Sequence, residues 1–193
     1  MTDQGTDKPA ILFTEAEIAR RVAEIGAEVT RAFAGRELCV VGVMKSCLCF
    51  MADLIRAVPL RSTCHFLRSS ALRETGSGTA RTDIVYSTEI PYEGRDILLL
   101  ASVIDTGITL NFLLDHIREH RPASLRVCTI IDKPGERKVD MKPDWAAFTL
   151  QEALPEGRFV VGYGLDHGEY YRGLPYIGTI PRPAPPARGL ASA

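Results

Sequence analysis

The feature that most constrains the fold is the segment of residues 96–117, which reads DILLLASVI, then DTGIT, then LNFLLDHI. Its first part is a continuous apolar run, and its last part carries apolar residues at helical spacing. A strand that is apolar on both faces needs cover on both sides, which is typical of parallel sheets. The segment therefore predicts a buried parallel strand that turns directly into a helix.

Other parts of the chain repeat this order. LCVVGV begins at Leu38 and is followed by a loop at Lys45 and Ser46 and by the helical stretch CFMADLIRAV. TCHFLR and LRVCTII indicate two further strands. Strands that alternate with helices predict an α/β fold, in which a parallel sheet is flanked by helices on both faces.

The two ends of the folded region add to this pattern. Thr14 and Glu17 have the spacing of a capping box, and an amphipathic helix is predicted after them by Ile18, Val22, Ile25, Val29 and Phe33. Beyond Trp145, FVVGYGL and LPYIGTI predict strands of a small hood over the sheet edge. We expect a short polar helical piece between these strands.

Length and composition favour one domain. The 193 residues, of which 46% are hydrophobic, suffice for a single core. Polar ends that contain Gly and Pro predict disordered tails at residues 1–10 and 182–193, which leaves residues 11–181 as the domain. Residues 69–81 are polar and lack an apolar period, so we expect a long loop there, either a lid or a disordered excursion.

Charge and hydropathy exclude several kinds of partner. The formal net charge of −1 gives no basic field for nucleic acid. No apolar stretch is long enough to span a bilayer, and the N-terminus lacks the pattern of a signal peptide, so we expect a cytoplasmic protein without a membrane partner. Reduced, buried thiols are expected, without metal or redox spacing, at Cys39, Cys47, Cys49, Cys64 and Cys128.

The turn at residues 105–109, DTGIT, carries the clearest chemistry. It lies where an apolar strand meets a helix, so its N–H groups and hydroxyls would gather at a helix N-terminus, where anions bind. An ordinary capped turn between a strand and a helix would have the same appearance, and these residues alone leave both interpretations open. A carboxylate beside an anion needs a proton or a base as its partner, which makes Asp105 the candidate catalytic residue.

Longer motifs resemble one enzyme family. Residues 94–180 are similar to the second half of hypoxanthine-guanine phosphoribosyltransferases in GRDILLLASVIDTGITL, DKPGERKVDMKPDW and FVVGYGLDHGEYYRGLPYIG, and the first half is similar in VGVMKSCLCFMADLIRAV. The resemblance implies a type I phosphoribosyltransferase fold with a small hood subdomain. It also implies purine salvage, in which hypoxanthine or guanine reacts with phosphoribosyl diphosphate to give a purine nucleotide and pyrophosphate.

The resemblance also implies roles for individual residues. Asp105 would lie near purine N7 as a general base, Lys133 would donate to the 6-oxo group, and Phe159 would stack on the base. The 5′-phosphate would be bound by Asp105, Thr106, Gly107, Ile108 and Thr109, and the purine by Lys133, Phe159, Val160, Leu165 and Asp166. The pyrophosphate side would hold Lys45, Ser46, Arg68 and Arg172, and Asp166 would also bind Mg²⁺.

Five positions in three active-site loops depart from the family pattern. Two adjacent acids that take the ribose hydroxyls and Mg²⁺ are replaced by Ala101 and Ser102, and a Ser-Tyr pair of the mobile loop is replaced by Ala71 and Leu72. The glycine of the pyrophosphate loop, where the family often has a cis peptide bond, is Ser46. Neither a methyl group nor a neutral hydroxyl replaces a carboxylate as a ligand of Mg²⁺.

Two hypotheses on function follow. The first is a working transferase, with Mg²⁺ held by Asp166 and by the diphosphate itself. The second is a non-catalytic relative that binds a purine nucleotide and acts as a regulator or as the partner subunit of an active paralogue. In both, the resemblance implies a homodimer or homotetramer.

Overall fold

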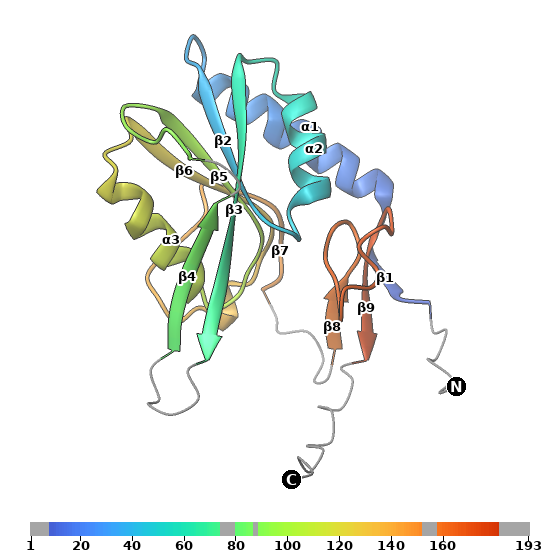
Figure 1. Ribbon diagram of the computed structural model, residues 1–193. Helices are drawn as coiled ribbons and strands as arrows, with labels where there is room; N and C mark the ends of the chain where they lie inside the picture. The colour runs from blue at the N-terminus through green and yellow to red at the C-terminus, as the bar shows by residue number, and fades with distance from the viewer. Residues whose placement is uncertain (1–7, 74–79, 87–88, 152–157, 182–193) are drawn as a thin grey trace.

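The structure is a computed structural model, and it describes residues 8–73, 80–86, 89–151 and 158–181 (Figure 1). A six-stranded sheet has the order β4-β3-β2-β5-β6-β7, and five of its strands are parallel, whereas β4 runs antiparallel to β3. The strands are β2 (Leu38–Val43), β3 (Ser62–Arg73), β4 (Ala80–Tyr86), β5 (Asp96–Ile104), β6 (Ser124–Asp132) and β7 (Trp145–Thr149). The predicted α/β fold with a parallel sheet is therefore confirmed.

Helices cover both faces of this sheet. One face carries α1 (Glu15–Ala32) and α2 (Leu48–Ala57), and the other carries α3 (Ile108–Glu119) (Figure 1). Strand β5 supplies both cores, because Leu98 and Leu100 pack with α1 and α2, whereas Ile97 and Leu99 pack with α3. This alternation explains why the sequence of β5 is apolar throughout.

The opening helix forms as the sequence predicts. Thr14 caps α1, its hydroxyl accepts the N–H of Glu17, and the Glu17 carboxylate accepts the N–H of Thr14 at 2.8 Å. The five predicted apolar residues are all at most 4% exposed. No helix among the described residues is long and apolar enough to cross a membrane.

A second, antiparallel sheet forms the hood. Its order is β1-β9-β8, from β1 (Ala10–Phe13), β9 (Ile177–Pro181) and β8 (Arg158–Val161), and Figure 1 shows it beside the end of the main sheet where the parallel strands finish. The two predicted hood strands are present as β8 and β9, but each is shorter than predicted. The prediction of a helical piece between them is wrong. Residues 162–176 form turns with isolated bridges, and their backbone hydrogen bonds join residues close in sequence without forming a helix.

Several further predictions need correction or lie outside the structure. Residues 69–73 and 80–81 are strand rather than loop, because β3 and β4 pair as a hairpin, with residues 74–79 outside the described part. β7 was not predicted. Of the five cysteines expected to be buried, Cys64 is exposed and Cys49 is half-buried. The predicted tails lie outside the described residues, except that Pro9 is buried and Ala10 begins β1.

Candidate functional site

Two neighbouring cavities open where the parallel strands end. The first, here called the turn cavity, measures about 240 Å³ and is bounded by the β5–α3 turn. The second, the hood cavity, measures about 250 Å³ and lies between the strand ends and the hood. Both cavities are lined by Ser46, Ser102, Val103 and Asp105, so they are two parts of one site.

The turn cavity is built on the predicted DTGIT segment. Gly107 caps α3 with a φ of 77°, and a Cβ atom there would come within 2.9 Å of Val139 Cγ2. Both conditions favour glycine. The carbonyl of Thr106 accepts the N–H of Lys138 at 2.9 Å, which ties the turn to the segment after β6. The N-terminus of α3 thus faces a cavity, with Thr109 in its lining.

Three more predicted residues lie at this turn. The Asp105 carboxylate accepts the N–H of Thr106 at 2.6 Å and lines both cavities. The Ile108 side chain is 53% exposed and lies outside both linings, so only its backbone N–H could contact an anion. Thr106 uses its hydroxyl within the turn, where it accepts the N–H of Ile108 at 3.5 Å.

The hood cavity brings together all five residues predicted for purine binding: Lys133, Phe159, Val160, Leu165 and Asp166. Lys133 follows β6, and its Nζ donates to Glu136 Oε1 at 3.2 Å. Phe159 is 39% exposed, and its ring makes a T-shaped contact with the ring of His167, with the ring centroids 5.4 Å apart. These five residues therefore contribute one cation, one carboxylate, one aromatic ring and apolar walls, which suits a flat heterocycle with an oxygen acceptor.

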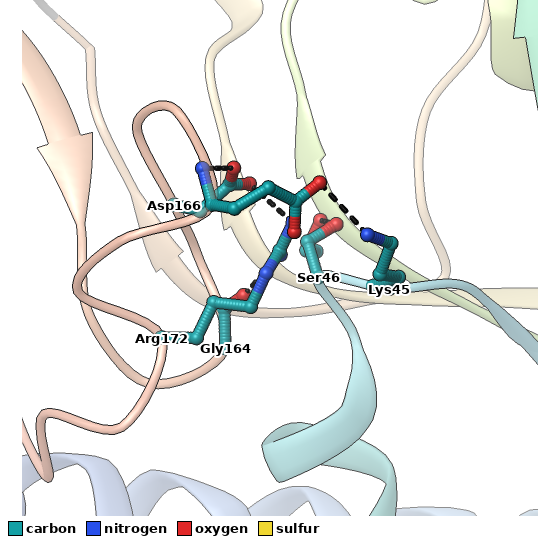
Figure 2. A network of polar contacts seen from close by, with 7 residues as sticks. Lys45, Ser46, Gly164, Asp166 and Arg172 are labelled. Atoms are coloured by element: carbon teal, nitrogen blue, oxygen red, sulfur yellow. Dashed lines mark hydrogen bonds and ion pairs between the residues drawn. The ribbon is translucent and has the colours of Figure 1, made fainter.

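A network of charged groups links the hood to the loop after β2 (Figure 2). Arg172 Nη2 lies 2.8 Å from Asp166 Oδ1 and 3.2 Å from Glu169 Oε2, while Arg172 Nη1 donates to the Gly164 carbonyl at 2.8 Å. Lys45 Nζ donates to Glu169 Oε1 at 2.8 Å. The pKa of Glu169 is lowered by these hydrogen bonds, first by that from Lys45 and then by that from Arg172.

Sequence reasoning missed two residues here. Glu169 joins Lys45 to Arg172. The only sign of this in the sequence was that Glu169 lies three residues before Arg172, which was predicted for the pyrophosphate side. Arg158 lines the hood cavity and donates to Thr179 Oγ1 at 3.1 Å. Its position next to Phe159 in a predicted strand was the only available sign.

The remaining predictions concern the loop after β2, Arg68 and the β3–β4 hairpin. The Met44–Lys45 peptide bond is cis, as the resemblance implied. Arg68 is exposed on β3, and none of the contacts among the described residues joins it to either cavity. Ala71 and Leu72 belong to the β3–β4 hairpin, but they lie outside the residues whose side chains the structure describes.

The donor set around the site does not fit a Mg²⁺ ion held by the protein. Ala101 is 6% exposed and has no side-chain oxygen, and the hydroxyl of Ser102 lies 2.6 Å from that of Ser46. Both oxygens of Asp166 are engaged, one by Arg172 and one by the N–H of Glu169 at 2.9 Å. Among the described residues, no three His, Cys, Asp or Glu side chains gather at one point. Mg²⁺ prefers carboxylates that are free to bind it.

Comparisons with known proteins give a consistent result. The phosphoribosyl transferase domain family matches residues 11–167. The hypoxanthine-guanine phosphoribosyltransferase of Bacillus subtilis is 38% identical over 174 residues, which cover 90% of this chain and 94% of that protein. The Mycobacterium avium hypoxanthine-guanine phosphoribosyltransferase is 35% identical, with 90% and 86% covered.

Solved structures agree with these relatives. A crystal structure of a hypoxanthine-guanine phosphoribosyltransferase from Bacillus anthracis has a TM-score of 0.78 at 33% identity, with 90% of this chain and 98% of that chain covered. A Trypanosoma cruzi hypoxanthine phosphoribosyltransferase in a ternary substrates complex has a TM-score of 0.79 at 29% identity, with 88% and 94% covered.

Proposed function

Because this chain belongs to the hypoxanthine-guanine phosphoribosyltransferase family, we propose that it joins a 6-oxopurine to the phosphoribosyl group of phosphoribosyl diphosphate and releases pyrophosphate. The observation that carries the proposal is that the two cavities meet at Asp105. In this proposal, the purine occupies the hood cavity and the 5′-phosphate occupies the turn cavity. The carboxylate of Asp105 then lies between them, where a purine proton has to be accepted.

In the hood cavity, Lys133 and Phe159 would recognise the base. Lys133 can donate to a 6-oxo oxygen, whereas the 6-amino group of adenine offers no acceptor there. Phe159 presents an exposed ring on which a flat base can stack. Val160 and Leu165 are at most 7% exposed and form the apolar wall. The proposed substrates are therefore hypoxanthine and guanine.

The turn cavity would bind the 5′-phosphate through the N-terminus of α3. The helix contributes backbone N–H groups and the positive end of its dipole, and Thr109 adds a hydroxyl. Lys45 and Arg172 belong to the charged network between the hood and the loop after β2, and they would face the pyrophosphate. Mg²⁺ would enter as part of the substrate, in complex with phosphoribosyl diphosphate.

The test is a chromatographic assay for nucleotide formation from guanine, hypoxanthine or adenine with phosphoribosyl diphosphate and Mg²⁺. We expect GMP and IMP to form and AMP not to form. Asp105→Asn should lower kcat about 100-fold or more, because it removes a general base. Lys138→Met changes an exposed side chain on the neighbouring segment and serves as the control. Equal rates with adenine would contradict the assignment of the hood cavity.

A second candidate function is supported by the altered metal side of the site. Ala101 and Ser102 offer no carboxylate, so a non-catalytic role as a binder of IMP or GMP, as a regulator or as a partner subunit, fits the same cavities. Tight binding of GMP without turnover in the assay above would favour this role. We also propose a homodimer or homotetramer in the cytoplasm, and light scattering of the purified protein tests the oligomeric state.

A further inference from the structure

The part of the site that faces the pentose has few groups that could bind a divalent cation. A nucleotide with its base in the hood cavity and its phosphate in the turn cavity must place its sugar against the residues that line both: Ser46, Ser102, Val103 and Asp105. We propose that this pentose-facing part binds a 6-oxopurine nucleoside monophosphate without any divalent cation held by the protein. The inference rests on the proposed function and concerns the metal dependence of its binding steps.

The first support comes from the carboxylates. Asp166 is engaged at both oxygens, and Asp105 accepts the N–H of the next residue. Asp132, at the end of β6, is 6% exposed and is paired with Arg137. A cation at Asp166 would have to displace an existing partner, and no three His, Cys, Asp or Glu side chains gather to share a cation among the described residues.

The second support is the hydroxyl pair. Ser46 Oγ and Ser102 Oγ lie 2.6 Å apart, and one of them donates to the other. The pair connects the loop after β2 to the end of β5 and is neutral. Ala101, buried beside it, adds only a methyl group to the lining of the turn cavity. Apart from Asp105, the pentose therefore meets hydroxyl and apolar groups where a bound cation would need negative charge.

The third support is the balance of charge on the pyrophosphate side. Lys45 is paired with Glu169, and Arg172 is paired with both Asp166 and Glu169, so two cations face two carboxylates (Figure 2). An incoming diphosphate has to compete with these carboxylates. A monophosphate at the N-terminus of α3 meets no acidic residue in the first turn of that helix, and the neighbouring Asp105 carboxylate accepts the N–H of Thr106 instead of pairing with a cation. The site thus favours the mononucleotide over phosphoribosyl diphosphate.

The experiment is isothermal titration calorimetry of the full chain with GMP and with phosphoribosyl diphosphate, each in EDTA and in Mg²⁺. We expect the Kd for GMP to agree within about two-fold between the two conditions. We expect phosphoribosyl diphosphate to bind at least about ten-fold more weakly than GMP, with or without Mg²⁺. Electron paramagnetic resonance of added Mn²⁺ should detect no protein-bound ion in the GMP complex.

A matched set of variants tests the cause. Ala101→Glu with Ser102→Asp should create Mg²⁺-dependent binding of phosphoribosyl diphosphate, by about ten-fold or more, because it supplies two carboxylates. Ser102→Ala removes the hydroxyl without adding charge and should give no such gain. Ala101 is buried, so Ser102→Asp alone is the second variant, with thermal unfolding as the check of folding.

The outcomes separate this inference from the proposed function. Mg²⁺-dependent binding of phosphoribosyl diphosphate to the unaltered protein, at an affinity similar to that for GMP, would overturn the inference and leave the proposed function standing. A bound Mn²⁺ ion in the GMP complex would have the same effect. Failure to bind GMP in every condition would overturn both.

Discussion

The backbone of Gly164 lies directly against the carbonyl of Ser46. A Cβ atom on Gly164 would come within 2.4 Å of Ser46 O, and the φ of Gly164 is 94°. The N–H of Gly164 also donates to the carbonyl of Arg172 at 2.9 Å. The hood turn therefore rests on the loop after β2, and the hood cavity depends on a contact that only glycine allows.

The first prediction concerns this contact. Gly164→Ala should lower the free energy of unfolding by about 2 kcal/mol or more, because a side chain both strains the backbone and meets Ser46 O. Gly168→Ala is the control, since Gly168 has a φ of 59° but no atom closer than 3.9 Å to an added Cβ. Urea unfolding measures both. Equal losses would show that backbone strain alone sets the cost.

Lys133 carries the second prediction. Lys133→Met should weaken GMP binding by about 1.5–3 kcal/mol, because a charged donor to the 6-oxo group is lost. AMP binding should change little. Glu136→Gln keeps Lys133 but removes the charge of its partner at 3.2 Å, so GMP binding should stay equal or improve. Calorimetry measures these affinities, and a similar loss for AMP and GMP would contradict the role of Lys133.

The third prediction separates binding from stability at Phe159. Phe159→Ala should weaken GMP binding by about 1–3 kcal/mol, the usual value for stacking of a base on an aromatic ring. Its effect on folding should be small, since the side chain is 39% exposed. Phe112→Ala on α3 is the control, because Phe112 is 43% exposed and lies outside both cavities. GMP affinity should be unchanged in that variant.

The fourth prediction is the pH dependence of the Lys45–Glu169 pair. The pKa of Glu169 is held below its usual value, chiefly by Lys45 and then by Arg172. A depressed pKa in the folded state means that the pair contributes above the unfolded pKa, and the contribution is lost as pH falls through the folded pKa. Lys45→Met should therefore raise the pKa of Glu169 in an NMR titration. Glu24, whose pKa is lowered by Arg20 and Arg21, should not change.

Sequence reasoning found those parts of the fold whose pattern is local. The apolar run of β5, the capping box of α1 and the turn at Gly107 each determine their structure within a few residues. β7, by contrast, is a short strand that depends on its parallel partner β6, and Trp145 pairs with Cys128 far back in the chain. The β3–β4 hairpin was missed because its polar residues lack an apolar period.

The site was predicted to a similar extent. Family motifs identified the five predicted purine-binding residues among those that line the hood cavity, because their order and spacing are preserved. The Ser46–Ser102 hydrogen bond joins two altered positions 56 residues apart, and each was visible in the sequence only as a lost family residue. The link between Glu169 and Lys45 spans 124 residues, so it too required the fold.

The last prediction concerns the sugar of the nucleotide. In the lining that both cavities share, Ser46 and Ser102 are hydrogen-bonded to each other, and Val103 offers no polar side-chain group. From Ser46 and Ser102 a 2′-hydroxyl can gain at most a neutral hydrogen bond, so GMP and 2′-deoxy-GMP should bind within about three-fold of each other. Ser102→Asp adds a charged acceptor and should raise the preference for GMP over 2′-deoxy-GMP to about ten-fold. Ser102→Ala should leave the ratio of the two affinities near one. Competitive calorimetry measures the ratio, and a strong preference for GMP in the unaltered protein would mean that Asp105 or the backbone reads the 2′-hydroxyl instead.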